Sequence, residues 1–458
     1  MEQTTAKKNK YEIDMCNGTI MDKLISFSLP LMLSGILQLM FNAVDIIVVG
    51  RFSGSQALAA VGSTSALINV FTNLFIGISL GANVLTARFY AAGREKEVSE
   101  TVHTAITLAL VSGIVMALVG LVFSKGALAL MGTPDDVIGL SALYMRIYFL
   151  GMPFFMLYNY GAAILRAVGD TKRPLLFLMI AGVINACLNM VLVIVFKLGV
   201  AGVAIATVIS QMISCVLVLR CLCRSESSYR LRFSELGMKG YYLKQIFSVG
   251  VPAGIQSTVI NFSNVLLQSS VNSFGSTAMA GYTAANNLLG FLYVSVNSIM
   301  SFTSQNYGVG KLKRMDRVLA DCMILSVVVA VVLGCICYGF GPEILQIYTE
   351  DAEVIACGME ILAYTTITYF LCGWMDLFPG ALRGMGYSAV PMVLSVIGTV
   401  GTRVVWIFGI FPYHRSLAIL FISYPASWII TIVLQVICFY FVRRRVHRRS
   451  QALAGQEA

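Results

Sequence analysis

The sequence has 458 residues, of which 58% are hydrophobic and only 12% are charged, and its mean hydropathy is +0.81. A soluble domain carries about 25% charged and 45–50% apolar residues, so this composition excludes a water-soluble enzyme and indicates a polytopic membrane protein. The net charge of +10 does not indicate a nucleic-acid partner, because the basic residues fall in alternate loops between apolar runs, as they do in proteins oriented in a bilayer.

The chain opens with a polar segment, 1–23, which has neither the short apolar core nor the cleavage site of a removable signal peptide. Beyond it, apolar stretches long enough to cross the hydrocarbon core, about 20 residues each, recur along the chain. They predict twelve spans, at 24–49, 58–86, 99–123, 138–165, 174–196, 200–222, 245–270, 278–305, 318–341, 354–381, 391–411 and 416–442. The predicted parts are a tail at 1–23, an N-lobe at 24–222, a linker at 223–244, a C-lobe at 245–442 and a tail at 443–458.

Loop charges predict the orientation of these spans. With the N-terminus in the cytoplasm, 26 of the 32 basic residues fall on the cytoplasmic side and four fall outside, while Arg146 and Arg403 lie within spans. Positive charge concentrates on the cytoplasmic side of membrane proteins, so both termini are expected in the cytoplasm.

The two halves of the chain resemble each other at a shift of 217 residues. Tyr90–Arg94 matches Tyr307–Lys311, and Leu165–Gly169 matches Leu382–Gly386. Because each half has an even number of spans, both enter from the same side and are related by a pseudo-two-fold axis along the membrane normal. The predicted fold is an all-α membrane protein of twelve helices in two six-helix lobes, whose rocking could give alternating access.

Ionisable residues inside spans are functional candidates by default, and only two carboxylates lie clearly within spans, Asp45 and Asp376. Gln38 and Asn42 share the helical face of Asp45. Polar residues at similar spacing occur in other spans: Asn69 and Asn73 in the second, Asn185 and Asn189 in the fifth, and Thr207 and Gln211 in the sixth.

Amide and hydroxyl oxygens can coordinate sodium or hydrogen-bond a carboxyl, and an apolar surround favours the protonated form of an acid. We therefore predict a coupling-ion site at Asp45 with Asn42, Asn185, Asn189 and Thr207. Sodium is the only metal ion expected there, and the amides could alternatively serve only to join neighbouring helices.

A substrate cleft is predicted from the remaining polar residues, Gln38, Asn69, Asn73, Asn264, Gln268 and Asp376. Asp376 could be a second proton or substrate-cation site, or it could form an ion pair with Arg403. Pro30 removes a backbone donor on the helix of Asp45 and is the predicted bending point. The scattered cysteines are typical of small buried hydrophobic residues.

Taken in order, these features resemble the multidrug and toxic compound extrusion (MATE) transporters, and most closely their DinF-like prokaryotic branch. The resemblance rests on Pro30 followed by Asp45, on Ala57–Gly62 and Leu165–Asp170, and on Asn185 to Asn189 followed by Thr207. It implies a monomeric antiporter of the prokaryotic plasma membrane that exports organic cations in exchange for protons or sodium, with no other cofactor. It also implies that Asp45, Asn185, Asn189 and Thr207 form the ion site of the N-lobe.

This sequence departs from the family pattern at Asn189, where many relatives carry a second acid. The neutral amide makes tight sodium binding less favourable and leaves the coupling ion open between protons and sodium. One alternative is a flippase of a lipid-linked or amphiphilic substrate on the same fold. Another is an intramembrane aspartyl protease using Asp45 and Asp376, although no Gly-x-Gly-Asp arrangement surrounds Asp376.

Overall fold

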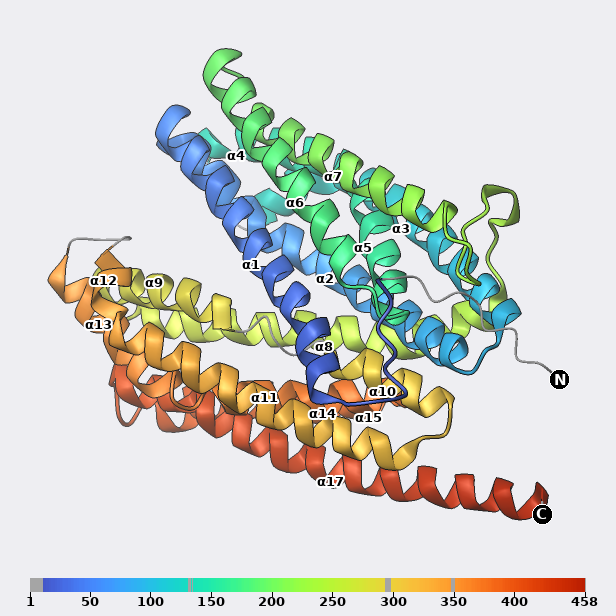
Figure 1. Ribbon diagram of the computed structural model, residues 1–458. Helices are drawn as coiled ribbons and strands as arrows, with labels where there is room; N and C mark the ends of the chain where they lie inside the picture. The colour runs from blue at the N-terminus through green and yellow to red at the C-terminus, as the bar shows by residue number, and fades with distance from the viewer. Residues whose placement is uncertain (1–10, 131–132, 134, 293–297, 347–350, 458) are drawn as a thin grey trace. The chain divides into compact units, whose positions relative to one another are not determined.

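The computed structural model describes residues 11–130, 133, 135–292, 298–346 and 351–457, and regular structure within these ranges is helical (Figure 1). The first half holds α1 (Met21–Phe52), α2 (Ser55–Ala91), α3 (Glu95–Leu130), α4 (Asp135–Leu150), α5 (Met152–Ala167), α6 (Lys172–Asn189), the π-helical η1 (Met190–Val195), α7 (Gly199–Cys223) and the short η2 (Phe233–Glu235). The second half holds α8 (Gly240–Asn272), α9 (Ser276–Leu292), α10 (Ser298–Gly308), α11 (Leu312–Gly339), α12 (Gly341–Gln346), α13 (Ala352–Thr365), α14 (Tyr369–Gly384), α15 (Ala389–Ser395), η4 (Val396–Gly401), α16 (Thr402–Val405), η5 (Trp406–Ile410) and α17 (Leu417–Glu457).

Eight of the described helical segments are long and apolar enough to cross a membrane, and ten if each of two bent pairs is one span. The bent pairs are α4 with α5, at 48°, and α13 with α14, at 51°. The other two predicted spans correspond to α8 and to α9 followed by α10. The predicted tail at 443–458 is helical through Glu457, as the continuation of α17.

The chain folds into two compact units, and none of its three changes of unit occurs in the predicted linker. One unit contains residues 1–14 and 30–254, and the other contains residues 15–29 and 255–458. The chain therefore changes unit between Asp14 and Met15, before α1, and then twice within helices: inside α1 at Pro30, and inside α8 two residues after Pro252. Both helices carry a proline next to the point where they change unit.

Close packing of α8 on α2 explains why the first part of α8 belongs to the first unit. Each helix has two glycines spaced by four residues, Gly77 and Gly81 on α2 and Gly250 and Gly254 on α8. A Cβ atom on Gly77 would overlap the backbone of Gly254, and one on Gly250 would lie 2.5 Å from the Cα of Ile78. Glycines at this spacing allow two helix backbones to approach closely in a membrane.

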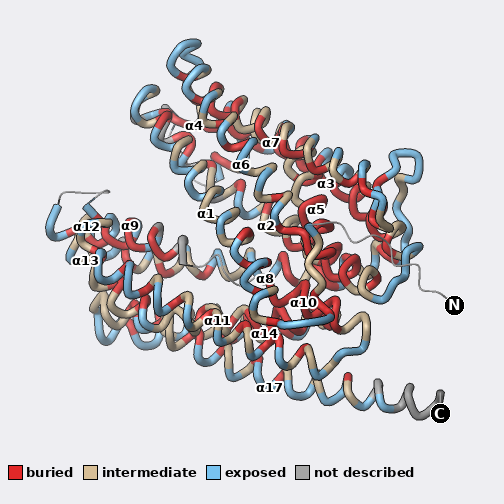
Figure 2. Tube along the Cα trace, viewed as in Figure 1, coloured by how far each residue is buried: buried red, intermediate tan, exposed pale blue. Residues whose placement is uncertain are grey.

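The core of the first unit is centred on α3 and α5. Figure 2 shows buried residues concentrated in these helices. Gly113 of α3 packs directly against the backbone of Pro153, and Gly120 packs directly against the ring of Phe149, so neither position has room for a side chain. The Nδ2 of Asn83 on α2 donates to the carbonyl of Ala163 at 2.8 Å and ties α2 to α5.

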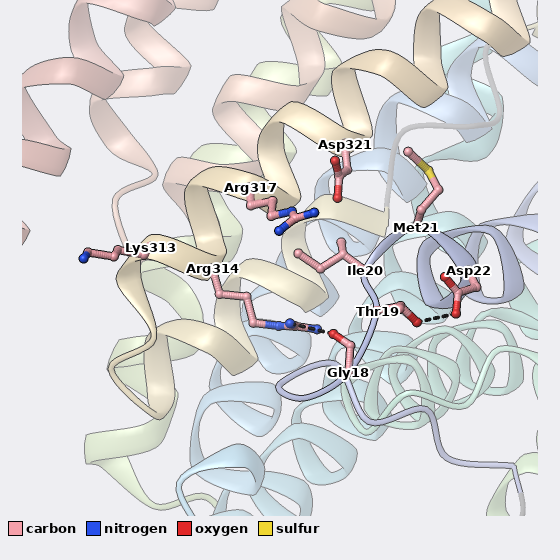
Figure 3. Close-up of a pocket in the computed structure, with 9 residues that line it drawn as sticks. All are labelled: Gly18, Thr19, Ile20, Met21, Asp22, Lys313, Arg314, Arg317 and Asp321. Atoms are coloured by element: carbon pink, nitrogen blue, oxygen red, sulfur yellow. Dashed lines mark hydrogen bonds between the residues drawn. The ribbon is translucent and has the colours of Figure 1, made fainter.

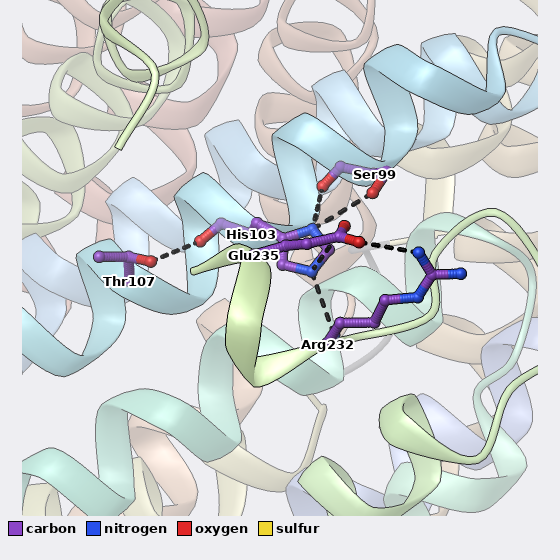
Figure 4. A network of polar contacts seen from close by, with 5 residues as sticks. All are labelled: Ser99, His103, Thr107, Arg232 and Glu235. Atoms are coloured by element: carbon purple, nitrogen blue, oxygen red, sulfur yellow. Dashed lines mark hydrogen bonds and ion pairs between the residues drawn. The ribbon is translucent and has the colours of Figure 1, made fainter. Parts of the chain in front are cut away.

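A buried histidine on α3 fixes the segment between α7 and α8 (Figure 4). The Nδ1 of His103 donates to the carbonyl of Ser99 at 2.7 Å, and its Nε2 accepts from the backbone N–H of Arg232 at 3.1 Å. Arg232 in turn donates to Glu235 at 2.7 Å, and this hydrogen bond holds the pKa of the Glu235 carboxyl below its usual range. These bonds require a neutral imidazole with its proton on Nδ1.

Replacing His103 by Leu is expected to loosen this segment. The substitution removes the acceptor of the Arg232 amide, and one hydrogen bond contributes about 1 kcal/mol, so amide exchange at Arg232 should accelerate about fivefold. Hydrogen–deuterium exchange measured by mass spectrometry tests this. Ser99→Ala is the control, because it keeps the Ser99 carbonyl; equal exchange in His103→Leu and wild type would contradict the assigned contact.

Candidate ion-binding site

Four of the predicted residues from α1, α6 and α7 meet in the first unit. The Oδ1 of Asp45 accepts a hydrogen bond from the Nδ2 of Asn189, which also donates to the Oδ1 of Asn185 at 3.2 Å. The Nδ2 of Asn185 donates to the hydroxyl of Thr207 at 3.5 Å, and the Thr207 hydroxyl lies 3.5 Å from the Oδ2 of Asp45. The four side chains form a closed ring, which we call the Asp45 ring.

Two oxygens of the Asp45 ring have spare capacity to accept hydrogen bonds. The single proton of the Thr207 hydroxyl makes its shorter bond, 2.9 Å, to the carbonyl of Val203, so the Oδ2 of Asp45 receives only the weaker contact of 3.5 Å. The Oδ1 of Asn189 is buried and has no hydrogen-bond partner among the described residues. Such oxygens are suited to a proton on the carboxyl or to a small cation.

Local sequence explains how α1 and α6 bring Asp45 to Asn189. Asn185 and Asn189 are four residues apart and lie on the same face of α6. One turn before them, Gly182 has no side chain, and the ring of Phe41 on α1 occupies the space that a Cβ atom would need. The π-helical η1 begins directly after Asn189, and such irregular turns are frequent at functional sites.

Aromatic and amide groups near the Asp45 ring were not among the predicted site residues. Tyr144 and Tyr148 on α4 have stacked rings with centroids 6.1 Å apart and lie within electrostatic range of Asp45. The Oε1 of Gln211, one turn after Thr207 on α7, is buried without a hydrogen-bond partner among the described residues. Tyr144 and Tyr148 are four residues apart, as are Thr207 and Gln211, and this spacing is the sequence signal that could have predicted these neighbours of the ring.

The other predicted residues of the first unit lie outside the Asp45 ring. Asn42 is one turn before Asp45 but is exposed, and Gln38 is exposed on the same helix. On α2, Asn69 is exposed and Asn73 is half-buried. Asn42 was predicted as part of the ion site, and the hydrogen bonds of the ring do not include it.

Arg403 of the second unit is buried among neutral groups. Its guanidinium donates to the Oδ1 of Asn264 at 2.7 Å and to the hydroxyls of Ser263 and Ser427 at 3.2 and 3.4 Å, and it lies 4.7 Å from the ring centroid of Tyr424. These contacts hold Arg403, and whether Asp376 is a transport site or a partner of Arg403 stays a prediction.

Gln268 on α8 and Asp376 on α14 are half-buried in the second unit, as is Asn264. The other three residues predicted to line the substrate cleft, Gln38, Asn69 and Asn73, belong to the first unit. That these six residues line one cleft stays a prediction.

Comparisons with known proteins agree on the class of this protein. A family model described as MatE matches residues 30–191 and 252–408, so that its two matched segments begin at Pro30 and Pro252. The probable multidrug resistance protein YoeA of Bacillus subtilis is 32% identical and aligns over 92% of this chain and 93% of its own length. The multidrug export protein MepA of Staphylococcus aureus is 22% identical and aligns over 82% of this chain and 84% of its own length.

Solved structures show the same fold. An outward-facing multidrug resistance MATE family transporter of the MOP superfamily superposes with a TM-score of 0.87 at 19% identity, covering 97% of this chain and all of the other. A MATE crystal structure in the bent conformation superposes with a TM-score of 0.83 at 19% identity, covering 96% and 98% of the two chains.

Fold and sequence together define a multi-pass membrane transporter with twelve helices in two lobes, which confirms the predicted fold class and excludes an enzyme. The chain belongs to the MatE family.

Proposed function

We propose that this transporter is a secondary antiporter that exports organic cations, including drugs, in exchange for protons or sodium. Both termini are in the cytoplasm, and rocking of the two lobes gives alternating access. The names of the relatives as multidrug resistance and export proteins support the class of cargo. The observation that carries the proposal is the Asp45 ring, in which the carboxyl is held by the Asn189 amide and the Thr207 hydroxyl, and the Asn185 amide joins these two partners to each other.

The Asp45 ring can satisfy both a charged and a neutral carboxyl. The Asn189 amide donates to the carboxylate through Nδ2, and its buried Oδ1 can accept a hydrogen bond from a protonated carboxyl. For sodium, the oxygens of Asp45, Asn189 and Thr207 are ligands of the type that hard cations take. With one carboxylate in the ring, one monovalent ion restores neutrality, so each transport cycle exchanges one coupling ion at this site.

Proteoliposomes with separately imposed gradients test the proposal. Ethidium serves as the organic cation, and its movement is followed by fluorescence under a proton gradient alone or a sodium gradient alone. The proposal predicts that at least one of these gradients drives ethidium against its own concentration gradient. Ethidium transport that is the same with and without each of the two gradients would overturn the proposal.

Replacing Asn189 by Asp is expected to shift the site towards sodium. A second carboxylate in the Asp45 ring would leave a net negative charge after one proton or cation binds, and the attraction for sodium would increase. Transport driven by a sodium gradient should then reach half its maximum at a sodium concentration about tenfold lower, equivalent to about 1.4 kcal/mol. Asn159→Asp on α5, a half-buried amide that donates to the carbonyl of Phe155 on its own helix, is the matched control and should leave this concentration unchanged; no difference between the two variants would contradict the prediction.

A further inference from the structure

A charged cavity of about 610 Å³ lies in the second unit, at the first turns of α1 and α11 (Figure 3). One wall is the segment Gly18–Asp22, and the other is the face of α11 that carries Lys313, Arg314, Arg317 and Asp321. Both helices are long and apolar enough to span a membrane, and both begin at this cavity. The cavity is therefore at the depth where a span meets the lipid headgroups.

Arg314, one of the three basic residues of the cavity, binds the segment that forms the opposite wall. The guanidinium of Arg314 donates to the carbonyls of Met15, Asn17 and Gly18 at 3.2, 3.1 and 2.8 Å. The segment before α1 is thereby fastened to α11. On the same wall, the Thr19 hydroxyl donates to Asp22.

The other charges of the cavity remain available to a ligand. The structure gives Lys313, Arg317 and Asp321 no hydrogen bond or ion pair with another described residue. In Figure 3, Arg317 extends towards Ile20 with Asp321 one turn further along α11, while Lys313 extends outward from the rim. The cavity thus offers two cationic groups and the Asp321 carboxylate to a ligand, while the second carboxylate of its lining, Asp22, accepts the Thr19 hydroxyl on the opposite wall.

The face of α11 that lines the cavity continues as exposed apolar surface. Arg317 and Asp321 are followed on this face by Ile324 and Val328, which are 55% and 53% exposed. The spacing of three to four residues keeps these side chains in one row. A charged end followed by an apolar row is complementary to an amphiphile.

The face of α1 next to the cavity has the same organisation. Asp22 is followed at helical spacing by Ile25 and Leu29, which are 47% and 53% exposed. All three residues belong to the second unit, as α11 does. Two apolar rows therefore begin at the same cavity.

We propose that this cavity binds the headgroup of a phospholipid that carries a primary ammonium group, with its acyl chains along the exposed rows of α1 and α11. The planar guanidinium of Arg317 matches two phosphate oxygens, and Lys313 adds a second positive charge. The Asp321 carboxylate, one turn along the helix, accepts the ammonium. A lipid with an anionic headgroup would place its hydroxyls beside Asp321 without a positive charge to pair with that carboxylate.

Binding of defined lipids to the delipidated full-length protein in detergent tests the proposal. Native mass spectrometry measures binding of dioleoyl phosphatidylethanolamine, the phosphatidylcholine and phosphatidylglycerol with the same chains, and inorganic phosphate. The expected result is about tenfold tighter binding of phosphatidylethanolamine than of phosphatidylcholine, because the methylated ammonium cannot donate hydrogen bonds to Asp321. Equal binding of these two lipids, or tighter binding of phosphatidylglycerol, would overturn the assignment of the headgroup.

Three variants locate the site. Lys313→Gln with Arg317→Gln should weaken phosphatidylethanolamine binding at least tenfold, whereas the matched double variant Lys244→Gln with Arg444→Gln, which removes the same charge from exposed positions elsewhere, should not. Asp321→Asn should reduce phosphatidylethanolamine binding to the level of phosphatidylcholine. Wild-type binding by the Lys313 and Arg317 variant would overturn the site, and saturable binding of inorganic phosphate at these residues would show that the ligand is a soluble phosphate rather than a lipid.

Discussion

Replacing Asp45 by Asn is expected to abolish drug efflux while leaving the fold intact. The amide has nearly the same shape as the carboxyl, and its oxygen can still accept the hydrogen bond from Asn189. It can neither gain nor lose a proton, and it has no negative charge to attract sodium. Ethidium efflux from energised proteoliposomes should therefore fall to background, with a thermal unfolding midpoint within a few degrees of wild type.

The matched control is Glu360→Gln, which neutralises a half-buried acid on α13 of the second unit. This variant should retain efflux. Efflux by Asp45→Asn at the wild-type rate would show that the Asp45 ring does not couple transport. A large fall in its unfolding midpoint would instead show that the carboxyl is needed for folding.

Enlarging Gly77 to Leu is expected to give the largest loss of stability. Even the first added carbon would overlap the backbone of Gly254, so α2 and α8 would have to separate along their whole contact. Overpacking of this kind typically costs 1–3 kcal/mol, and a displacement of two helices should cost about the upper value or more. The fraction of protein recovered as a monodisperse peak and the unfolding midpoint in detergent measure the loss.

Gly62 on the same helix supplies the control for this experiment, because no atom in the described part of the chain lies within 4 Å of the position that its Cβ atom would take. Gly62→Leu should leave the midpoint close to the wild-type value. Equal midpoints for Gly77→Leu and Gly62→Leu would contradict the close packing of α2 on α8.

Helical periodicity and hydropathy were enough to predict the four residues that form the Asp45 ring. An acid in an apolar run at Asp45, amides spaced by four residues at Asn185 and Asn189, and a hydroxyl at Thr207 are all visible in the printed sequence. The structure joins these four by hydrogen bonds. Buried polar groups need partners, which is why polar residues within spans so often meet each other.

Helical periodicity could not show which of the predicted residues contact each other, because those contacts depend on tertiary packing. Asn42 shares a helical face with Asp45 and is nevertheless exposed. Helix α6 approaches α1 where the ring of Phe41 fills the space beside Gly182, and this contact determines which side chains of α1 are covered by α6. Spacing along one helix does not show which neighbouring helix will approach it. For the same reason the hydrogen bonds of Arg403 to Ser263, Asn264 and Ser427 could not be predicted from the sequence.

The division of the chain into units also depended on a contact between distant segments. The glycine pairs Gly77 with Gly81 and Gly250 with Gly254 are visible in the sequence, but their mutual packing is not. This packing places the first part of α8 in the first unit, whereas a boundary drawn from polarity falls in the linker at 223–244. Hydropathy identifies spans and polar segments, and it carries no information on which spans pack together.

The exchange of a coupling ion at Asp45 is tested most directly by measuring ion release when a cargo binds. Tetraphenylphosphonium is added to the purified protein in weakly buffered detergent, and protons and sodium are followed with a pH dye and a sodium electrode. One proton or one sodium ion should leave per bound cation in the wild-type protein, and neither should leave in Asp45→Asn. Release of the same ion in the same amount from both proteins would contradict the account.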